Sequence, residues 1–161
     1  MATTRRNVPA GAALVDMCRR LDLRARFVVT EPAPPSDLPA ESFDVIYAYS
    51  VFTHLSEELQ RAWIEEFRRL LRPGGVLVAS VKSRRFIGMC EELRRQPVPA
   101  SPLHETLAQS FADAAQAYAD YDADRFLSEP TGGGPGLPSD RFGLAVFRKA
   151  TSAARGRRIW K

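Results

Sequence analysis

The sequence has 161 residues, of which 45% are hydrophobic, and it carries a formal net charge of +4. This length and composition suit one globular domain with a hydrophobic core and exclude a disordered chain. No apolar run approaches the ~20 residues of a membrane-spanning helix, and the N-terminal segment lacks the continuous apolar core of a secretion signal. We therefore expect a cytoplasmic protein without a membrane partner.

The distribution of basic residues and cysteines argues against nucleic-acid and metal binding. The densest basic cluster lies at the C-terminus, at Arg155, Arg157, Arg158 and Lys161. A nucleic-acid-binding tail is one interpretation of this cluster, and a solvated chain end is the simpler one. The two cysteines lie in no CxxC or Cys/His spacing that would bind zinc. We expect no metal site and no nucleic-acid partner.

The first predicted elements are a helix and a strand. Apolar residues recur at helical spacing in residues 10–21, which predicts an amphipathic helix. The β-branched and aromatic segment "ARFVVTE" predicts a strand that ends near Thr30. Four prolines follow, and because proline continues neither a helix nor an interior strand, a loop should extend to Glu41.

The middle of the sequence predicts two strands joined by a helix. The mostly apolar run "FDVIYAYS" predicts a strand over 43–49 that is covered on both faces. Ser56 can cap the following helix, and the sequence Pro-Gly-Gly at 73–75 should end it. The run "GVLVASVK" at 75–82 predicts the second strand. Such a unit has parallel strands and a right-handed crossover, so the predicted fold class is α/β.

The remaining sequence gives weaker patterns. Residues 84–95 predict a short basic helix, and the alanine-rich residues 103–121 predict a longer one. Residues 129–139, "EPTGGGPGLPS", have the composition of a mobile linker. The run "RFGLAVFRK" predicts a last strand, and residues 150–161 form a basic tail.

Three segments should meet at the carboxyl ends of the strands, where open parallel sheets bind ligands. They are Thr30–Asp37, Tyr49–His54 and Ser80–Arg85. Glu31 directly follows a predicted strand, so its carboxylate could accept hydrogen bonds from a ribose hydroxyl or an adenine amino group. The alternative is a solvated loop carboxylate. We expect the candidate site near 49–54.

Residues of the second segment have more than one possible role. His54 could act as a general base or contact a substrate, because its unperturbed pKa lies near 6.5. Alternatively, it packs at the helix entrance and hydrogen-bonds to the backbone. Tyr47 and Tyr49 share one face of the strand, which predicts packing in the core with each hydroxyl at the rim. The sequence contains no nucleophile elbow, phosphate-binding loop, catalytic carboxylate pair or metal constellation.

A familiar pattern covers residues 38–81, "LPAESFDVIYAYSVFTHLSEELQRAWIEEFRRLLRPGGVLVASV". This stretch resembles the middle of class I S-adenosylmethionine-dependent methyltransferases, in which an acidic loop, a strand with the pattern "FDVI", a helix ending in "LLRPGG" and a further strand follow in this order. The resemblance implies a Rossmann-like fold with a mainly parallel sheet flanked by helices. It also implies S-adenosylmethionine as cofactor and methyl transfer to a small-molecule acceptor.

The same resemblance implies roles for single residues. Glu31 falls near the acid that contacts adenine in the family. Tyr49, Ser50 and Val51 match the strand end that lies along the methionine portion of the cofactor. His54 matches a histidine often seen there, and it is the candidate catalytic residue.

The resemblance is partial at the N-terminus. The family's first strand, its Gly-rich loop and the acid that ends its second strand would precede residue 10, and nine residues cannot hold them. We therefore expect one partial domain over 1–161 without the first two strands, as a truncated reading frame would give. Residues 84–140 would form a helical region on the substrate side, with the Gly/Pro linker at 129–139.

The missing strands also suggest an alternative to an enzyme. The predicted strand that ends near Thr30 would lose its neighbours, and its exposed edge would favour self-association. The chain would then be a non-catalytic methyltransferase-like remnant or an interaction module.

Overall fold

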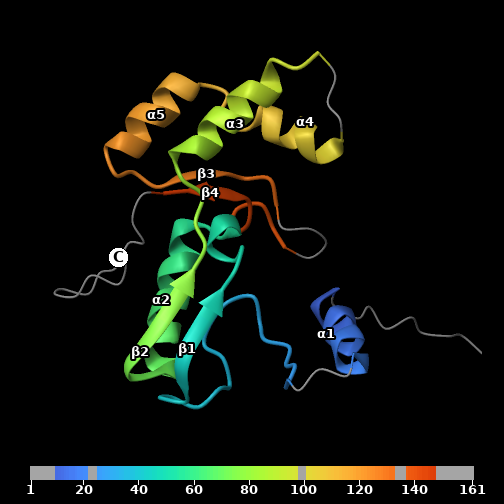
Figure 1. Cartoon of the computed structure of the whole chain (residues 1–161), viewed down its shortest axis with the longest axis vertical. Coiled ribbons are helices and arrows are strands. Elements are labelled where there is room, and N and C mark those ends of the chain that lie inside the picture. Colours follow the sequence, from blue (N-terminus) through green and yellow to red (C-terminus); the bar gives the residue numbers. More distant parts are fainter. Residues whose placement is uncertain (1–9, 22–24, 98–100, 133–136, 148–161) are drawn as a thin grey trace, which may run out of the picture.

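The computed structural model describes residues 10–21, 25–97, 101–132 and 137–147, which contain five α-helices and two small sheets (Figure 1). The first sheet is the parallel pair β1 (Phe43–Ala48) and β2 (Leu71–Ala79), and the second is the antiparallel pair β3 (Leu127–Glu129) and β4 (Leu144–Val146). Figure 1 shows that the carboxyl ends of β1 and β2 point toward the second sheet. The predicted α/β class is therefore confirmed for the described residues.

The helix α2 (Glu57–Leu70) joins β1 to β2. It begins as predicted, because the hydroxyl oxygen of Ser56 accepts a hydrogen bond from the Leu59 N–H and two glutamates occupy the positive end of the helix dipole. Val45 lies beside Val76 across the parallel pair. The predicted strand–helix–strand unit is thus confirmed.

The helix ends earlier than the Pro-Gly-Gly sequence predicts. Its last residue is Leu70, and β2 starts at the next residue. Proline at 73 pushes the residue before it toward an extended backbone, which shortens the helix. The N–H groups of Glu41 and Ser42 donate to the carbonyl oxygens of Arg69 and Leu70, at 2.9 Å each. These two bonds satisfy the helix end and lead the chain directly into β1.

The β1–β2 sheet is covered on one face only. Ala48 and Leu77 are buried against α2, where they pack with Phe52 and Ile64. Figure 1 shows α2 on one side of the two strands and no described helix on the other. The prediction that the strand is covered on both faces is therefore wrong. Apolar side chains remain exposed on the second face: Val45, Tyr47, Val76 and Val78.

Three helices lie at the far side of the second sheet, α3 (Arg84–Arg94), α4 (Pro102–Gln109) and α5 (Ala114–Asp122). The last two replace the single helix predicted over 103–121. Asp113 caps α5 by accepting a 2.9 Å hydrogen bond from the Gln116 N–H.

Two further contacts fix the break between α4 and α5. Phe111 has a left-handed backbone with φ of 52° and a buried ring. Arg94 donates to the carbonyl oxygens of Ser110 and Phe111, at 2.8 and 2.9 Å. A guanidinium from α3 therefore satisfies backbone groups that a continuous helix would have paired internally.

Strand β4 lies between two hydrophobic cores. Leu144 and Val146 pack into a cluster with the helices α3, α4 and α5, whereas Ala145 and Phe147 pack into the cluster beneath α2. Alternate residues of a strand point to opposite faces, so one short strand serves both cores. The last strand predicted from the sequence is confirmed, and its antiparallel partner β3 was not predicted.

The N-terminal part differs most from the prediction. Helix α1 (Ala10–Arg20) is confirmed, but residues 26–31 form no strand. A strand needs a neighbour to pair its backbone groups, and no described segment supplies one here. The predicted exposed edge near Thr30 therefore does not arise. The predicted basic tail at 150–161 lies outside the described residues.

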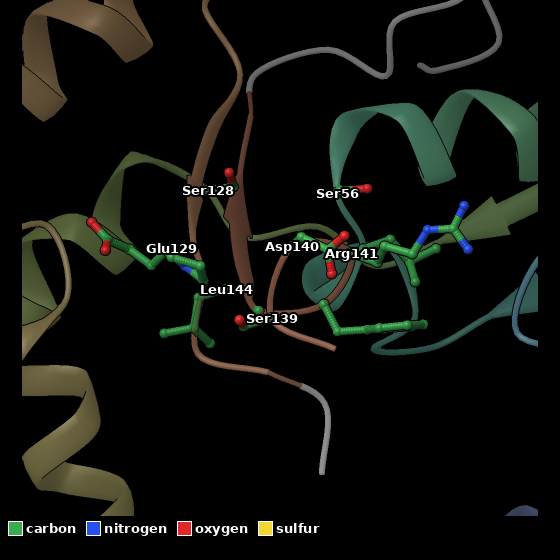
Figure 2. A pocket seen from close by; sticks show the side chains of 11 residues that line it. Ser56, Ser128, Glu129, Ser139, Asp140, Arg141 and Leu144 are labelled. Atoms are coloured by element: carbon green, nitrogen blue, oxygen red, sulfur yellow. The ribbon is translucent and has the colours of Figure 1, made fainter. Parts of the chain in front are cut away.

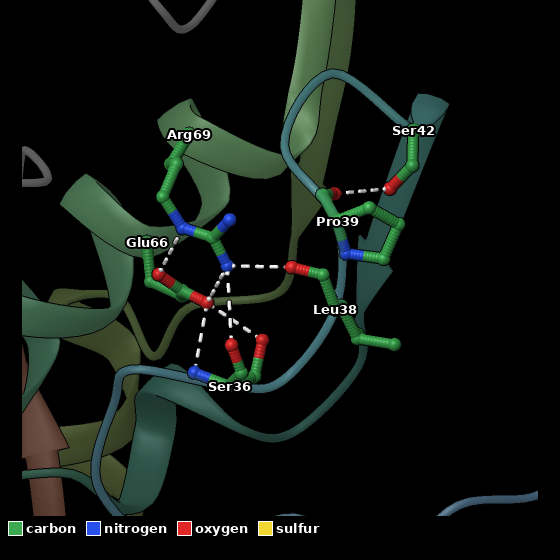
Figure 3. A network of polar contacts seen from close by, with 6 residues as sticks. All are labelled: Ser36, Leu38, Pro39, Ser42, Glu66 and Arg69. Atoms are coloured by element: carbon green, nitrogen blue, oxygen red, sulfur yellow. Dashed lines mark hydrogen bonds and ion pairs between the residues drawn. The ribbon is translucent and has the colours of Figure 1, made fainter.

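The proline-rich loop is bound to α2 instead of leading to the strand ends. The indole N–H of Trp63 donates to the carbonyl oxygen of Pro32 at 3.0 Å. Glu66 accepts hydrogen bonds from the N–H and hydroxyl of Ser36, at 2.9 and 2.6 Å (Figure 3). Arg69 donates to the same carboxylate and to the Leu38 carbonyl oxygen at 2.9 Å. These contacts hold the loop against the outer side of the helix.

Candidate functional site

The carboxyl ends of β1 and β2 are joined by three hydrogen bonds. The Ser80 N–H donates to the Ala48 carbonyl oxygen at 3.1 Å, and the Ser50 N–H donates to the Ser80 hydroxyl at 2.7 Å. Lys82 Nζ donates to the Thr53 carbonyl oxygen at 2.7 Å. Two of the three predicted segments, 49–54 and 80–85, therefore meet as the sequence predicts.

Ser50 has an unusual backbone at this junction. Its φ is 57°, in the left-handed region that costs a residue with a side chain roughly 1–2 kcal/mol. The bond from its N–H to Ser80 holds this conformation, and its hydroxyl lies 3.4 Å from the Thr53 hydroxyl. Such strained residues cluster at functional sites, so the turn after β1 is a candidate contact surface for a ligand.

His54 is held by the backbone before β4. Its Nδ1 lies 3.0 Å from the Gly143 carbonyl oxygen, and the Gly143 N–H donates to the His54 carbonyl oxygen at 3.0 Å. Burial lowers the pKa of His54 below its ordinary value, and the charge of Lys82 adds to this effect, against the Gly143 hydrogen bond. A neutral ring with Nδ1–H as donor fits this geometry. His54 thus has the packing role that the sequence left open, while its Nε2 forms no hydrogen bond to a described residue.

Lys82 brings a charged group to this turn. Burial lowers the pKa of its ammonium from 10.5 to about 8, and the ammonium lies 5.0 Å from the centre of the Phe86 ring. Sequence reasoning named the segment that contains Lys82 but not the residue itself. The available signal was a lysine at the end of an apolar strand. For Gly143 no local signal exists, because its contact with His54 joins residues far apart in the chain.

A groove of about 860 Å³ opens beside Lys82, between the start of α3 and α5. Arg84 stacks over the Tyr118 ring at 4.1 Å and pairs with Asp122 at 3.2 Å. Arg85 forms no hydrogen bond or ion pair with any described residue. The charged residues of the lining are three cations and one carboxylate, namely Lys82, Arg84, Arg85 and Glu92. The groove therefore favours ligands with negative charge.

A second, smaller cavity of about 320 Å³ lies between the start of α2 and the β3–β4 pair (Figure 2). Ser56, Asp140 and Arg141 line one side of it, and Glu129 lies on the other. The Glu129 carboxylate accepts a 2.8 Å hydrogen bond from the Phe111 N–H, so it already has a structural partner. This cavity is separate from the turn after β1 that the sequence singled out.

Tyr49 and Val51, two of the predicted cofactor contacts, are exposed at the end of β1. The Tyr49 ring is 71% exposed and stacks on Tyr47, with ring centres 6.3 Å apart. The two tyrosines share a face as predicted, but their predicted core packing is wrong. The reason is the uncovered face of the sheet, where no described helix covers the two stacked rings.

Glu31 does not join the other predicted site residues. It is exposed and forms no hydrogen bond or ion pair with another described residue. The loop that follows it is bound to α2, beginning with the contact between Trp63 and Pro32. The third predicted segment, 30–37, is therefore not brought to the strand ends.

The positions of the predicted cofactor contacts show how much of S-adenosylmethionine the described residues could bind. Tyr49, Ser50 and Val51 provide an exposed apolar and hydroxyl-bearing surface at a strand end, which suits one side of such a ligand. Glu31 provides no acid beside them, and the two cavities described above are lined by other residues. The described residues thus fit part of the cofactor and not its whole outline.

The described residues contain no group of three or more histidine, cysteine, aspartate or glutamate side chains arranged to hold a metal ion. None of the described helices has the length and apolar character needed to cross a membrane.

Comparison with known proteins gives a family match for part of the chain. Residues 11–77 match a family model described as a methyltransferase domain. No curated protein and no solved structure matches the chain. The matched segment begins in α1 and ends in β2, so it includes β1, α2 and the loop between α1 and β1. This match agrees with the family resemblance of residues 38–81 and covers less than half of the chain.

Proposed function

We propose that the protein takes part in S-adenosylmethionine-dependent methyl transfer to a small-molecule acceptor. The observation that carries this proposal is the joined end of β1 and β2, because β1 and most of β2 lie inside the segment that matches the methyltransferase family. Tyr49, Ser50 and Val51 are exposed there, and Lys82, which bonds to Thr53 in the same turn, lines the groove. A donor and an acceptor could therefore lie side by side at one edge of the sheet.

S-adenosylmethionine, when bound, would supply an electrophilic methyl group, and the rate of its in-line transfer would depend mainly on positioning. Tyr49 and Val51 would contact the cofactor through their exposed apolar surfaces, and Ser50 through its hydroxyl. The lowered pKa of His54 favours its neutral form, whose Nε2 could accept a proton from the acceptor. The acceptor would lie in the groove, where Lys82 and Arg85 favour an anionic molecule.

Titration calorimetry with S-adenosylmethionine and with its demethylated product tests the cofactor step. We expect heat of binding and a raised melting temperature, both reduced in Tyr49→Ala. Tyr47→Ala is the matched control, because this tyrosine is 68% exposed within β1, whereas Tyr49 lies just beyond the end of the strand. Absence of heat and of a thermal shift at millimolar ligand would refute cofactor binding by this chain.

The acceptor step has a separate test. Arg85→Gln should weaken the binding of small aromatic or aliphatic carboxylates without changing affinity for the cofactor, because Arg85 is exposed and bonded to no described residue. Arg68→Gln is a control with a similarly exposed arginine on another helix. If Arg85→Gln and Arg68→Gln bound these carboxylates with equal affinity, the groove would not be the acceptor site.

A non-catalytic interaction module is the second candidate function. The uncovered apolar face of the β1–β2 sheet favours it, because monomers rarely expose large contiguous apolar patches. This candidate predicts association that depends on protein concentration and needs no cofactor. A protein that stays monomeric and binds the cofactor would exclude it.

A further inference from the structure

Two apolar surfaces of the described chain have no partner. The first is the open sheet face, formed by Val45 and Tyr47 of β1 and by Val76 and Val78 of β2. The pairs Val45–Val76 and Tyr47–Val78 lie side by side in the parallel register, so the four side chains form one continuous surface. Their exposed fractions range from 44% to 68%.

The second surface is an apolar stripe formed by Leu14 and Met17 of α1 and by Leu21 directly after the helix. Their spacing of three and four residues places them on one side of the helix axis, and each is more than half exposed. Figure 1 shows α1 standing apart from the sheets. Arg19 donates a 3.0 Å hydrogen bond to the Phe27 carbonyl oxygen, the only side-chain hydrogen bond from α1 to another described segment. A helix of 11 residues is marginal without tertiary packing.

The two surfaces are both apolar, and they are similar in length. Parallel sheets are normally covered by helices on both faces, and this sheet has a helix on one. An 11-residue helix is about 16 Å long, and a six-residue strand is about 20 Å long. We propose that two copies of the chain pair reciprocally, with α1 of each copy lying on the open sheet face of the other.

The area that would be buried favours a dimer with two helix–sheet contacts over a dimer with only one. At roughly 150–250 Å² for a whole large side chain, the two surfaces together expose about 700 Å² per copy. A reciprocal pair would bury about 1,400 Å² in total, within the range of stable interfaces, whereas one helix on one sheet would bury about half of this. A dimer with twofold symmetry also buries both apolar surfaces of each copy, so neither surface remains free to bind a third copy.

The chain path favours docking on a second copy over docking on the same copy. Pro32, Ser36 and Leu38 are bonded to α2, which covers the opposite face of the sheet. From Pro32 onward the loop is thus attached on the far side of the sheet from the open face. The paired arrangement does not depend on methyl transfer, since neither surface includes the groove.

Sedimentation velocity of the full chain from about 1 to about 100 µM measures the association. We expect the mass to double with concentration. Leu14→Gln/Met17→Gln and Val45→Thr/Tyr47→Thr should each keep the protein monomeric. The matched control is Asp16→Gln/Arg20→Gln, which removes an exposed ion pair of α1 outside the apolar stripe and should leave the dimer intact. Far-ultraviolet circular dichroism checks that each variant remains folded.

Cross-linking tests which copy provides the helix. A tagged chain with Met17→Cys is mixed with an untagged chain carrying Tyr47→Cys, both with Cys18→Ser, and treated with a short bismaleimide. We expect a product with the mass of one tagged and one untagged chain. A monomer at all concentrations, a dimer unaffected by the α1 variants, or cross-links formed only when both cysteines lie on one chain would each overturn the proposal.

Discussion

The ammonium of Lys82 donates a 2.7 Å hydrogen bond to the carbonyl oxygen of Thr53, so a half-buried cation joins the end of β2 to the turn after β1. Its burial keeps the pKa near 8, well below the ordinary 10.5. At neutral pH the folded protein therefore carries a protonated Lys82. As pH rises, this side chain loses its proton more readily in the folded protein than in the unfolded chain.

Replacement of this cation should change how stability depends on pH. Between about pH 8 and 10.5 the unfolded chain binds more protons at Lys82 than the folded protein, so its contribution to the free energy of unfolding rises with pH. Lys82→Met removes this contribution. Urea denaturation from pH 7 to 10 should show the wild type gaining stability relative to the variant as pH rises. Arg85→Met, at an exposed cation, is the control, and parallel curves for wild type and Lys82→Met would contradict the burial of the ammonium.

His54→Gln tests the link between the turn and the strand β4. We expect a loss of about 1 kcal/mol, because the Nδ1–H no longer donates to the Gly143 carbonyl oxygen. The folded pKa of His54 lies below 6.5, so the wild type should lose stability as pH falls below that value, and the variant should lose less. Denaturation curves at pH 7.5 and pH 5.5 measure both effects. His104→Gln, in α4, is the comparison at the other histidine of the chain. An unchanged acid dependence of stability in His54→Gln would refute the lowered pKa of His54 in the folded protein.

The sequence predicted those helices and strands that depend on residues close together in the chain. The cap at Ser56 and the apolar runs on either side of α2 identified the strand–helix–strand unit, and parallel strands necessarily bring their carboxyl ends to one edge. The break at Asp113 also had a local signal, a capping residue before an alanine-rich run, but the high helix propensity of that run hid it.

Other features depend on which segments come together in space. The exposure of Tyr47 and Tyr49 depends on the absence of a covering layer, and no property of the strand itself reveals this. The same holds for Thr30, whose predicted strand lacks a neighbour. The contact of His54 with Gly143 joins two turns separated by most of the helical region. Pattern analysis of either turn alone could not predict it.

Gly143→Ala should disrupt the junction between β3 and β4. A Cβ atom at this position would overlap the backbone carbonyl group of Glu129, which cannot move without separating the two strands. Overpacking of this kind costs about 1–3 kcal/mol. Because Gly143 also bonds to His54 in both directions, hydrogen exchange of the amide at position 143 should accelerate. Gly74→Ala is a comparison in which the new Cβ meets no atom, although its φ of 85° adds backbone strain. If Gly143→Ala left the protein as stable as the wild type, the two strands would not be closely packed.

The carboxylate of Glu66 accepts hydrogen bonds from Ser36 of the N-terminal loop and from Arg69 (Figure 3). It is 6% exposed, and the hydrogen bond from Arg69, with further bonds from Ser36, lowers its pKa from 4.5 to about 2. A carboxyl group with a lowered folded pKa stabilises the protein above the unfolded value, and that stabilisation is lost as pH falls from about 4.5 to about 2. Glu66→Gln should therefore cost about 2 kcal/mol at pH 7 and lose stability less steeply in acid.

The matched control for Glu66→Gln is Glu65→Gln on the same helix. Glu65 pairs with Arg68 at 3.8 Å, and both side chains are more than half exposed, so the loss should stay within about 0.5 kcal/mol. The fluorescence of Trp63, whose indole holds the loop at Pro32, should respond to Glu66→Gln before global unfolding, because the loop loses its second attachment. Equal stability losses in the two variants would mean that the buried carboxylate contributes no more than a surface ion pair, and that the loop is held to α2 by other contacts.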